Sequence, residues 1–425
     1  QQAQRLLQQD PLHEPTAILL MRLHALSGDR AGVRRVYQNC VTVLEQELGV
    51  EPSPTTQAAY EQYLRLQAPL SVPETSLPAP ASVASPLPTQ RPRPLPAPRT
   101  TFLGRKHELA ELALRLADPA CRLLTVVGPG GMGKTRLALE TAKGHLPIFD
   151  DGVAFIPLAA VASVDLLIAA MADALNFTLV GDAAPDEQLV RYLDRKSVLL
   201  VLDNFEHLLA GAALLSTLLD NTSGVKLLVT SRERLNLQEE WVFELGGLPI
   251  LAAPSSIGEE DVAVALFLQS AQRVRQNFAP TEQELGAIHR ICQLVGGLPL
   301  GIELAATWVR VLACTEIVRE IERSLDFLTT TMRNLPERHR SLRAVFDHSW
   351  QLLSPAEQRI FRRLALFRGG FTWAAAEQVA EATLPILSTL VDKSLIQRMG
   401  SGRFGLHQLL GQYAQERLTE AGEVA

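Results

Sequence analysis

The residues best suited to chemistry form one short run, Gly128-Pro-Gly-Gly-Met-Gly-Lys134-Thr135. An apolar run, Leu123–Val127, precedes it, and a helix-like stretch, Arg136–Lys143, follows it. Glycines let the backbone bend so that successive N–H groups point at phosphate oxygens, and the helix adds its positive N-terminal end. The lysine then reaches the β and γ phosphates, and the threonine hydroxyl ligates Mg²⁺. The run therefore predicts a phosphate-binding loop between a strand and a helix.

A second candidate residue, Asp203, ends another apolar run, Val198-Leu-Leu-Val-Leu-Asp203. At the end of a neighbouring strand its carboxylate would hold Mg²⁺ through water. Fast ATPases with this loop carry a second acid next to the aspartate, but this chain has Asn204 there. An amide orients water but cannot accept its proton. Glu206 is the nearest remaining acid, so we predict slow hydrolysis of the bound nucleotide.

A third candidate residue, Arg232, follows the apolar run Lys226–Thr230. A guanidinium at this point can reach a γ-phosphate and report its presence. The alternative is an arginine that only caps the strand or pairs with Glu233. We favour the sensor role, because this strand comes in the correct place after Asp203. The predicted catalytic set is therefore Lys134, Asp203 and Arg232, with Thr135 and Asp203 at the metal.

The elements that must position these residues alternate between strand-like and helix-like runs, which predicts a parallel α/β sheet. The expected strands are Leu123–Val127, Val153–Pro157, Val198–Leu202 and Lys226–Thr230. After about Leu248 the strands stop, and helices are expected over Glu259–Asn277, Thr281–Val295 and Leu300–Leu312. From Arg338 more helices lead to a hairpin, Leu395–Arg398 with Arg403–Leu406, as in a winged-helix module. The predicted domains are a P-loop nucleotide-binding domain at 100–247, a helical lid at 248–334 and a winged-helix domain at 335–425.

The N-terminal part, before residue 100, differs in its residue pattern and composition. Residues 1–67 show helical spacing of apolar residues broken at Gly28 and Gly49, which predicts helix pairs of the tetratricopeptide-like kind. Residues 68–99 form a proline-rich linker that holds ten of the 26 prolines. Docking of its PxxP-like pieces on an aromatic groove is the alternative to a plain spacer. The chain begins at Gln1, inside a helix-like stretch, so we expect a fragment that starts within a domain.

The amino-acid composition indicates which cellular compartment and which kinds of binding partner to expect. Hydrophobic residues make up 47% and charged residues 20% of 425 residues, and the net charge is -6. This charge gives no general attraction to nucleic acid. No apolar run approaches the roughly 20 residues that cross a bilayer. Because the four cysteines are far apart and form no zinc spacing, we expect buried thiols and a cytoplasmic protein.

Five motifs in order resemble the NB-ARC type of STAND ATPase. They are Phe102-Leu-Gly104-Arg105, Gly128–Thr135, Leu199–Asn204, Thr230–Arg232 and Gly297-Leu-Pro299-Leu300, and the resemblance covers Thr100 to about Leu418. It implies an α/β nucleotide domain, a helical lid and a winged-helix domain, and it implies ATP and ADP as ligands.

The resemblance also assigns residues. The turn with Phe102, Gly104 and Arg105 would lie against the adenine and ribose, and Pro299 would pack on the base. His407 falls where the family has the histidine of Met-His-Asp, so it would contact the β-phosphate of ADP and lock the closed state. Gln408 replaces the family's acid, which puts the strength of that lock in doubt; an ordinary surface histidine is the alternative. The expected nucleotide contacts in the loop are Gly128, Gly130, Gly131, Met132, Gly133, Lys134, Thr135 and Arg136.

Other pieces resemble bacterial regulators. Leu342–Trp350, Leu364–Phe371 and Leu390–Leu395 look like the matching region of bacterial STAND regulators, and Asp10–Glu14 with Glu47–Pro52 resembles a bacterial transcriptional activation domain. In SARP-type regulators that domain follows a DNA-binding winged helix and precedes a STAND ATPase. The resemblance therefore implies DNA contact through an N-terminal domain outside these residues. The arginines between 333 and 343 form a small basic cluster, which we interpret as a solvated or interdomain surface rather than a DNA contact.

Three functions remain as hypotheses. The first is a switch in a transcription regulator, closed with ADP, opened and assembled with ATP, reset by slow hydrolysis and controlled by an unknown inducer or protein signal. The second is a continuously cycling ATPase or phosphotransferase, which Asn204 argues against. The third is a scaffold with a vestigial nucleotide site, which the intact Lys134, Thr135 and Asp203 argue against.

Overall fold

A computed structural model of the chain describes two units, Gln1–Ser85 and Pro86–Ala425. In the first unit the described residues are single positions and short runs between Thr16 and Tyr60, almost all helical. The rings of Tyr37 and Tyr60 stack there with centroids 3.9 Å apart. Most of the expected helical segment 1–67 and of the linker 68–99 lies outside the described residues. In the second unit these are 92–97, 100–180, 183–251, 261–330 and 340–423.

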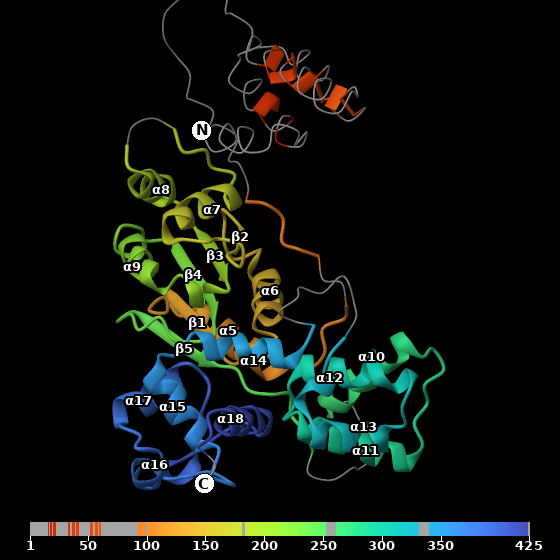
Figure 1. Cartoon of the computed structure of the whole chain (residues 1–425). Coiled ribbons are helices and arrows are strands. Elements are labelled where there is room, and N and C mark those ends of the chain that lie inside the picture. Colours follow the sequence, from red (N-terminus) through yellow and green to blue (C-terminus); the bar gives the residue numbers. More distant parts are fainter. Residues whose placement is uncertain are drawn as a thin grey trace, which may run out of the picture. The chain divides into compact units, whose positions relative to one another are not determined.

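A five-stranded parallel sheet lies at the centre of the second unit, with the strand order β2-β3-β4-β1-β5 (Figure 1). The strands are rich in Val and Leu and almost wholly buried except at the edges, as expected for a parallel sheet covered on both faces. β5 was not expected from the sequence. The strands are β1 (Leu123–Val127), β2 (Val153–Pro157), β3 (Val198–Asp203), β4 (Val225–Ser231) and β5 (Glu240–Glu244).

Helices cover the two faces of this sheet and form two separate apolar cores. Side chains of α7, α8 and α9 pack into one core, whereas those of α5 and α6 belong to the other, larger core. The larger core continues into the helices that follow the sheet. The helices around the sheet are α5 (Lys106–Ala117), α6 (Lys134–His145), α7 (Leu167–Ala174), α8 (Pro185–Leu193) and α9 (Ala212–Asp220).

Four helices form the segment expected to be a lid, here called the lid segment (261–330). They are α10 (Val262–Val274), α11 (Glu282–Leu294), α12 (Pro299–Ala306) and α13 (Cys314–Arg323). Thr281 and Glu284 form a reciprocal capping box that fixes the start of α11. Pro299 opens α12 at its first position, where a missing N–H costs no helical hydrogen bond. α13 was not expected from the sequence.

The C-terminal part, here called the winged-helix segment (340–423), has helices followed by a hairpin, as expected. Its helices are α14 (Leu342–Gln351), α15 (Pro355–Leu364), α16 (Trp373–Ala380), α17 (Leu384–Asp392) and α18 (Gln408–Glu420). The antiparallel hairpin pairs β6 (Gln397–Met399) with β7 (Arg403–Gly405). A further bridge between Phe371 and Phe404 ties the hairpin to the helices.

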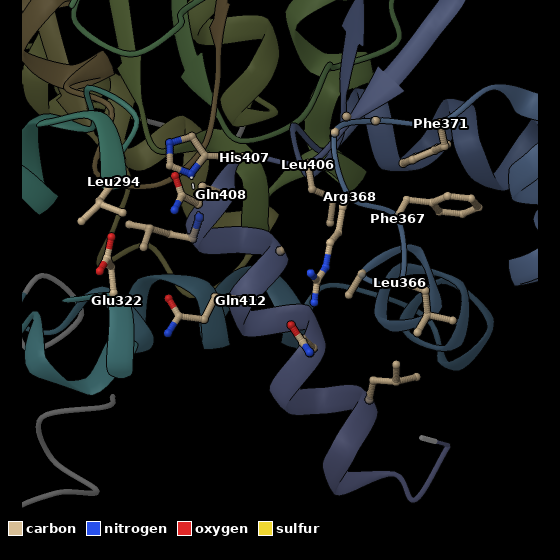
Figure 2. A pocket seen from close by; sticks show the side chains of 18 of the residues that line it. Leu294, Glu322, Leu366, Phe367, Arg368, Phe371, Leu406, His407, Gln408 and Gln412 are labelled. Atoms are coloured by element: carbon tan, nitrogen blue, oxygen red, sulfur yellow. Dashed lines mark hydrogen bonds between the residues drawn. The ribbon is translucent and has the colours of Figure 1, made fainter. Parts of the chain in front are cut away.

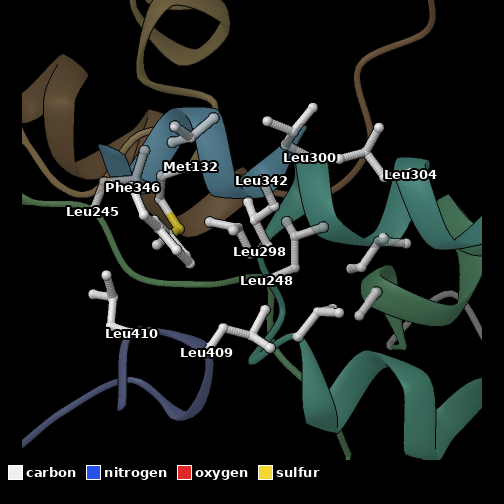
Figure 3. Packing of buried hydrophobic residues seen from close by; sticks show 14 of the residues in the cluster. Met132, Leu245, Leu248, Leu298, Leu300, Leu304, Leu342, Phe346, Leu409 and Leu410 are labelled. Atoms are coloured by element: carbon white, nitrogen blue, oxygen red, sulfur yellow. The ribbon is translucent and has the colours of Figure 1, made fainter. Parts of the chain in front are cut away.

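The sheet, the lid segment and the winged-helix segment meet in the larger core (Figure 3). Met132 from the loop after β1 lies there with Leu300 of α12 and Phe346 of α14. Leu409 of α18 joins the same cluster. Because one buried cluster contains residues from all three parts, displacement of the winged-helix segment would expose apolar surface beside the loop.

The last part of the proline-rich linker, 92–97, has no helix or strand and runs along the sheet domain. The Arg93 N–H donates to the carbonyl of Ala174 at 3.0 Å, and its guanidinium pairs with Asp173 at the end of α7. This end of the linker is therefore attached to α7. All four cysteines are buried, as expected, and burial raises the pKa of Cys121 to about 11. None of the helices within the described residues has the length and apolarity needed to cross a membrane.

Candidate functional site

The loop between β1 and α6 has the backbone that its glycines predict. Gly131 and Gly133 have φ values of 79° and 88°, in the left-handed region that favours glycine. Gly133 is the residue before α6, and Lys134 is the first residue of that helix. The loop therefore delivers the helix N-terminus and a lysine to one place, as a phosphate site requires.

Lys134 lies against its own loop. Its Nζ donates to the carbonyls of Gly128 at 2.7 Å and of Pro129 at 3.1 Å. Burial lowers the pKa of Lys134 to about 8, while the carboxylates of Glu206 and Asp203 oppose that shift. Lys134 is thus held by two neutral carbonyls of the loop, and an incoming phosphate would be a stronger, charged partner for its ammonium group.

Asp203 is placed by β3 next to the residue expected to share a metal with it. Its Oδ1 accepts from Thr230 Oγ1 at 2.6 Å, and the Thr135 hydroxyl also donates to this carboxylate. Burial raises the pKa of Asp203, and these hydrogen bonds oppose the rise. Thr230 is opposite Asp203 in the ladder of β3 and β4. The sheet therefore fixes Asp203 through Thr230, while Thr135, the hydroxyl predicted to bind Mg²⁺ with Asp203, comes from the start of α6.

Asn204 continues this strand end with a positive φ of 68°, a conformation that asparagine tolerates. Its N–H donates to Thr230 Oγ1 at 3.0 Å. Glu206 follows in a short 3-10 turn, Phe205–His207, and is 4% exposed. Hence the acid near Asp203 that the sequence left as a candidate does border the site, although it is not adjacent to Asp203.

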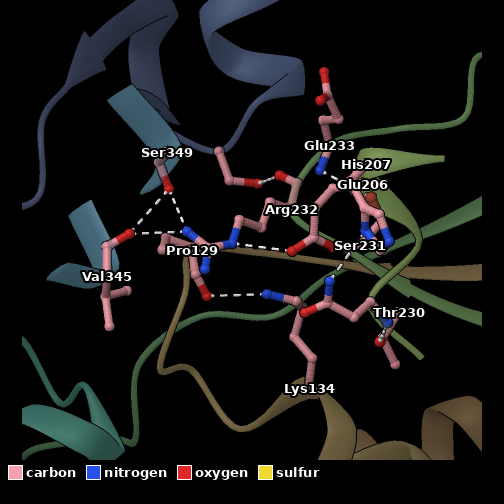
Figure 4. A network of polar contacts seen from close by, with 12 residues as sticks. Pro129, Lys134, Glu206, His207, Thr230, Ser231, Arg232, Glu233, Val345 and Ser349 are labelled. Atoms are coloured by element: carbon pink, nitrogen blue, oxygen red, sulfur yellow. Dashed lines mark hydrogen bonds and ion pairs between the residues drawn. The ribbon is translucent and has the colours of Figure 1, made fainter. Parts of the chain in front are cut away.

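Arg232 connects the site to the winged-helix segment (Figure 4). Its Nε lies 3.1 Å from Glu206 Oε1 in a buried ion pair. Its Nη1 donates to the carbonyl of Val345 at 2.9 Å and to Ser349 Oγ at 2.6 Å, both in α14. The Arg232 carbonyl accepts from Ser394 Oγ at 2.9 Å. The arginine therefore pairs with Glu206 rather than with Glu233, and it holds two parts of the winged-helix segment.

A cavity of about 240 Å³ lies between these groups. The loop residues 130–136 form one wall, and the strand ends contribute Asn204, Glu206, Thr230 and Arg232. The start of α12 closes it with Pro299, Leu300 and Glu303. Leu300 N donates to the carbonyl of Gly131 at 3.2 Å, which attaches the lid segment to the loop. Of the three predicted catalytic residues, Lys134 and Arg232 line this cavity, whereas Asp203 lies behind its lining residue Thr230, to which it is hydrogen-bonded.

A smaller cavity of about 50 Å³ adjoins the first, where the base was expected. Phe102, Arg105 and Pro299 are among the residues that line it. Five residues line both cavities: Met132, Gly133, Arg136, Pro299 and Glu303. The two spaces are therefore neighbours, one beside the phosphate loop and the other beside the predicted base-binding residues.

Hydrogen bonds fix the turn around Phe102. Arg136 donates to the carbonyls of Thr100, at 2.6 Å, and Thr101, and its guanidinium lies over the Phe102 ring, 5.7 Å from the centroid. Gly104 has a φ of 65°, and Val262 of α10 occupies the space that a side chain there would need.

Arg105 also has a positive φ, 61°, and precedes α5. Its guanidinium donates to the carbonyl of Gly246 at 2.7 Å and pairs with Glu108. The charge of Arg105 is therefore already engaged, and its contribution to the small cavity is mainly one of shape.

His407 does not line the phosphate cavity, so its contact with a β-phosphate stays a prediction. Among the described residues it lines a different cavity of about 840 Å³, between α13, the turn after α15 and α18 (Figure 2). The ring lies directly against Gly296, where any side chain would collide with its Nε2. Its Nδ1 accepts from Leu409 N at 3.3 Å and so caps α18.

Sequence reasoning missed two groups of residues. Glu303 lines both cavities, and its helical spacing from Pro299 was a usable signal, because residues four apart share a helix face. Val345 and Ser349 bind Arg232 from more than a hundred positions away, and no local pattern marks such a contact. Ser394, with a φ of 55°, belongs to the same group.

Models of two domain families match the chain. The bacterial transcriptional activator domain matches residues 1–64, and an AAA domain matches residues 118–237. The second match covers β1 to β4 with the phosphate loop, Asp203 and Arg232.

Among curated proteins, the chain is 35% identical over 313 residues to the putative HTH-type transcriptional regulator Rv0890c of Mycobacterium tuberculosis, covering 71% of this chain and 34% of that protein. It is 34% identical to Rv0894 of the same organism, covering 76% of this chain and 83% of that protein. It is 30% identical to the regulatory protein AfsR of Streptomyces coelicolor, covering 95% of this chain and 40% of AfsR. The chain thus spans about a third of the length of the first of these relatives.

Two solved structures are similar in part. One is a STAND protein with a tetratricopeptide repeat sensor from Pyrococcus horikoshii, at 14% identity and a TM-score of 0.34, covering 78% of this chain and 44% of that one. The other is the Aeropyrum pernix ORC2 protein in ADPNP–ADP complexes, at 15% identity and a TM-score of 0.43, covering 78% and 96%. From the domain order and the match over most of Rv0894, this chain belongs to the family of AfsR-like regulators of the SARP type, with a bacterial transcriptional activator domain ahead of a P-loop ATPase domain.

Proposed function

We propose that this chain is a nucleotide-controlled switch, in which ADP keeps the winged-helix segment docked and ATP favours its release. The position of Arg232 carries this proposal. Its guanidinium borders the phosphate cavity and also donates to Val345 and Ser349 of α14. A group shared by a ligand site and a second segment links occupancy of the site to docking.

The γ-phosphate is the group by which Arg232 would distinguish the two nucleotides. A phosphate is a strong, charged acceptor for a guanidinium, whereas α14 offers a neutral carbonyl and a hydroxyl. ATP would therefore compete with α14 for Arg232. ADP ends at its β-phosphate and would leave the contacts with Val345 and Ser349 in place. Binding of ATP thus shifts the population toward the undocked form.

Slow hydrolysis would reset the switch. Water attacks the γ-phosphorus as the bond to the β–γ bridging oxygen breaks, and the water proton needs an acceptor. Asn204 orients this water without taking its proton. Glu206 borders the cavity, but one of its oxygens is engaged by Arg232. A proton acceptor that is already ion-paired fits slow turnover rather than continuous cycling.

Thr135 and Asp203 would hold Mg²⁺ at this site. Mg²⁺ at nucleotide sites takes one or two protein oxygens, and phosphate oxygens and water supply the rest. A hydroxyl and a carboxylate in contact beside the cavity fit this donor set. Within the described ranges no three His, Cys, Asp or Glu side chains gather as a metal cage. The bound ion would neutralise phosphate charge during hydrolysis.

The base would lie in the smaller cavity. Phe102 and Pro299 both line it with apolar side chains, and the volume of about 50 Å³ suits part of a planar ring rather than a large group. The turn at Gly104 and Arg105 shapes its edge. This arrangement supports adenine as the base, which the family resemblance also implies.

The proposed role in transcription regulation is based on the descriptions of the relatives. Rv0890c is described as a putative HTH-type transcriptional regulator and AfsR as a regulatory protein. We extend that role to this chain and assign DNA contact to a domain outside these residues. Release of the winged-helix segment would expose apolar side chains such as Phe346 and Leu409, which supports self-assembly in the ATP state. An inducer or protein signal would favour that release, in the cytoplasm.

The first experiment identifies the nucleotide that the purified protein carries. The protein is denatured, and the released nucleotide is measured by ion-exchange chromatography. Near-stoichiometric ADP is expected for the wild type and none for Lys134→Ala. Lys143→Ala is the matched control, because Lys143 lies on the same helix and pairs with Glu140 away from the cavity. It should retain ADP.

Other outcomes separate the remaining functions. An empty wild-type protein that turns over added ATP faster than about one per second would favour a continuously cycling ATPase. If neither ADP nor ATP binds to the wild type, the switch is wrong and a scaffold with a vestigial site takes its place.

A further inference from the structure

The two adjoining cavities determine where the sugar of a bound nucleotide would lie. The base belongs in the smaller cavity and the phosphates in the larger one, so the ribose must cross the boundary between them. Five residues line both cavities, and they therefore surround the sugar. They are Met132, Gly133, Arg136, Pro299 and Glu303.

Only one of these five side chains is suited to accept hydrogen bonds from sugar hydroxyls. Gly133 has no side chain, Pro299 offers only its ring, and Met132 is buried in the apolar core. Arg136 is a donor, and its guanidinium is already engaged by the carbonyls of Thr100 and Thr101. Glu303 presents two carboxylate oxygens, and within the described ranges no hydrogen bond or ion pair engages them.

The helix α12 fixes this carboxylate relative to the phosphate loop. Pro299 and Glu303 are four residues apart, so both face the cavities from one side of the helix. The hydrogen bond from Leu300 N to the Gly131 carbonyl, at 3.2 Å, attaches the start of α12 to the loop. Hence the distance between Glu303 and the phosphates is set by a helix rather than by a flexible chain.

We propose that Glu303 binds the ribose hydroxyls and makes this site selective for ribonucleotides over deoxyribonucleotides. The inference rests on the proposed nucleotide site and adds a specificity residue to it. A diol donates two hydrogen bonds, and a carboxylate accepts them with the strength of a charge-assisted contact.

The surroundings of Glu303 favour this contact. Burial raises the pKa of its carboxyl, while the positive charges of Arg136 and Arg273 oppose the rise. A partly buried carboxylate without a direct partner gains more from a hydroxyl donor than an exposed one does. Loss of that donor leaves the carboxylate unsatisfied again, so the site should discriminate against sugars that lack the hydroxyls.

The test compares affinities for three ligands by isothermal titration calorimetry with the full chain stripped of nucleotide. The ligands are ADP, 2′-deoxy-ADP and 3′-deoxy-ADP. The wild type should bind ADP about ten-fold or more tightly than at least one deoxy analogue, as expected for a hydrogen bond to a charged group. In Glu303→Leu, the affinity for ADP should fall to that for the analogue, while the affinity for the analogue itself stays within about two-fold.

The control variant is Glu282→Leu, which removes an exposed glutamate from another lid helix. It should keep the wild-type preference for ADP. A wild type that binds the three ligands equally overturns the inference without any variant, and so does an undiminished preference in Glu303→Leu. If Glu303→Leu does not fold, Glu303→Gln should reduce the preference, because the amide retains only a neutral acceptor. Failure of the wild type to bind any of the three ligands would instead refute the nucleotide site itself.

Discussion

Arg232 Nη1 donates a hydrogen bond to Ser349 Oγ at 2.6 Å, across 117 positions of the chain. The same guanidinium borders the phosphate cavity and pairs with Glu206. Ser349 belongs to α14, whose Val345 packs so closely on Gly130 that a side chain there would collide with it. The phosphate loop and the winged-helix segment are therefore in direct contact at the residue expected to sense a γ-phosphate.

Replacement of Ser349 by alanine should favour ATP. Ser349→Ala removes one acceptor that competes with the γ-phosphate for Arg232, a contact of about 1 kcal/mol. We expect the affinity for a non-hydrolysable ATP analogue to rise about five-fold relative to that for ADP. Competition binding with a fluorescent nucleotide measures both. Ser216→Ala on α9, on the other face of the sheet, is the control. Equal changes for both nucleotides would refute competition for Arg232.

An acid beside Asp203 should accelerate hydrolysis. Asn204→Asp supplies a proton acceptor at the position where fast ATPases carry one, and aspartate tolerates the φ of 68° found there. We expect kcat to rise at least ten-fold, within the range known for general bases. Phosphate release under saturating ATP measures the rate. Asn176→Asp, at another asparagine with positive φ, should leave the rate unchanged. An unchanged rate in Asn204→Asp would mean that proton transfer does not limit turnover.

Acid should weaken the packing around His407. Burial lowers the pKa of this imidazole, and the carbonyls of Val295 and Gly296 oppose only part of the shift. The unfolded chain therefore binds the proton more readily, so stability present above about pH 6.5 is lost as the pH falls below it.

The measurement for His407 is the melting temperature at pH 7.5 and pH 5.5. The drop should be smaller in His407→Gln than in the wild type. His107→Gln, an exposed histidine on α5, should behave as the wild type does. Identical drops in all three proteins would show that His407 does not contribute to the acid sensitivity.

A helix in the lid segment should gain stability from one methyl group. Gly286 lies inside α11, is exposed, and has open space where a side chain would project. Gly286→Ala should stabilise the protein by about 0.5–1 kcal/mol, because alanine loses less conformational freedom in a helix. Thermal unfolding measures the gain. The opposite change is expected for Gly297→Ala, whose φ is 67° and whose side chain would meet the carbonyl of Leu248. A destabilised Gly286→Ala would show that this position is not open.

The elements around the phosphate loop were predictable because their signals are local. β1 and β2 have the expected bounds, since each is a continuous apolar run beside turn residues. β5 was missed because Glu240–Glu244 is not a continuous apolar run, is half exposed and is paired only with β1 at the edge of the sheet. α13 was also missed, although its apolar residues Ile317 and Ile321 lie four apart on a polar background.

Some residues of the site were predictable from local sequence signals, and others were not. Lys134, Thr135 and Asp203 come together as expected, because a motif and two strand ends place them. The position of His407 depends on how α18 packs against Gly296, and the partners of Arg232 depend on how α14 packs against the loop. Such contacts are decided by shape and burial among distant segments, so no spacing in the sequence reports them.

Val127 and Ser231 lie opposite each other in the ladder that joins β1 to β4. β1 leads directly into the phosphate loop and β4 leads directly into Arg232. The loop and the arginine are therefore both held by one close-packed sheet. The set-point of the switch, meaning the ATP:ADP ratio at which it opens, is therefore adjustable through the contacts that Arg232 makes with the winged-helix segment, at Val345 and Ser349 of α14 and at Ser394. An engineered sensor with a chosen set-point would be obtained by varying residues 345–349 while keeping the strands untouched.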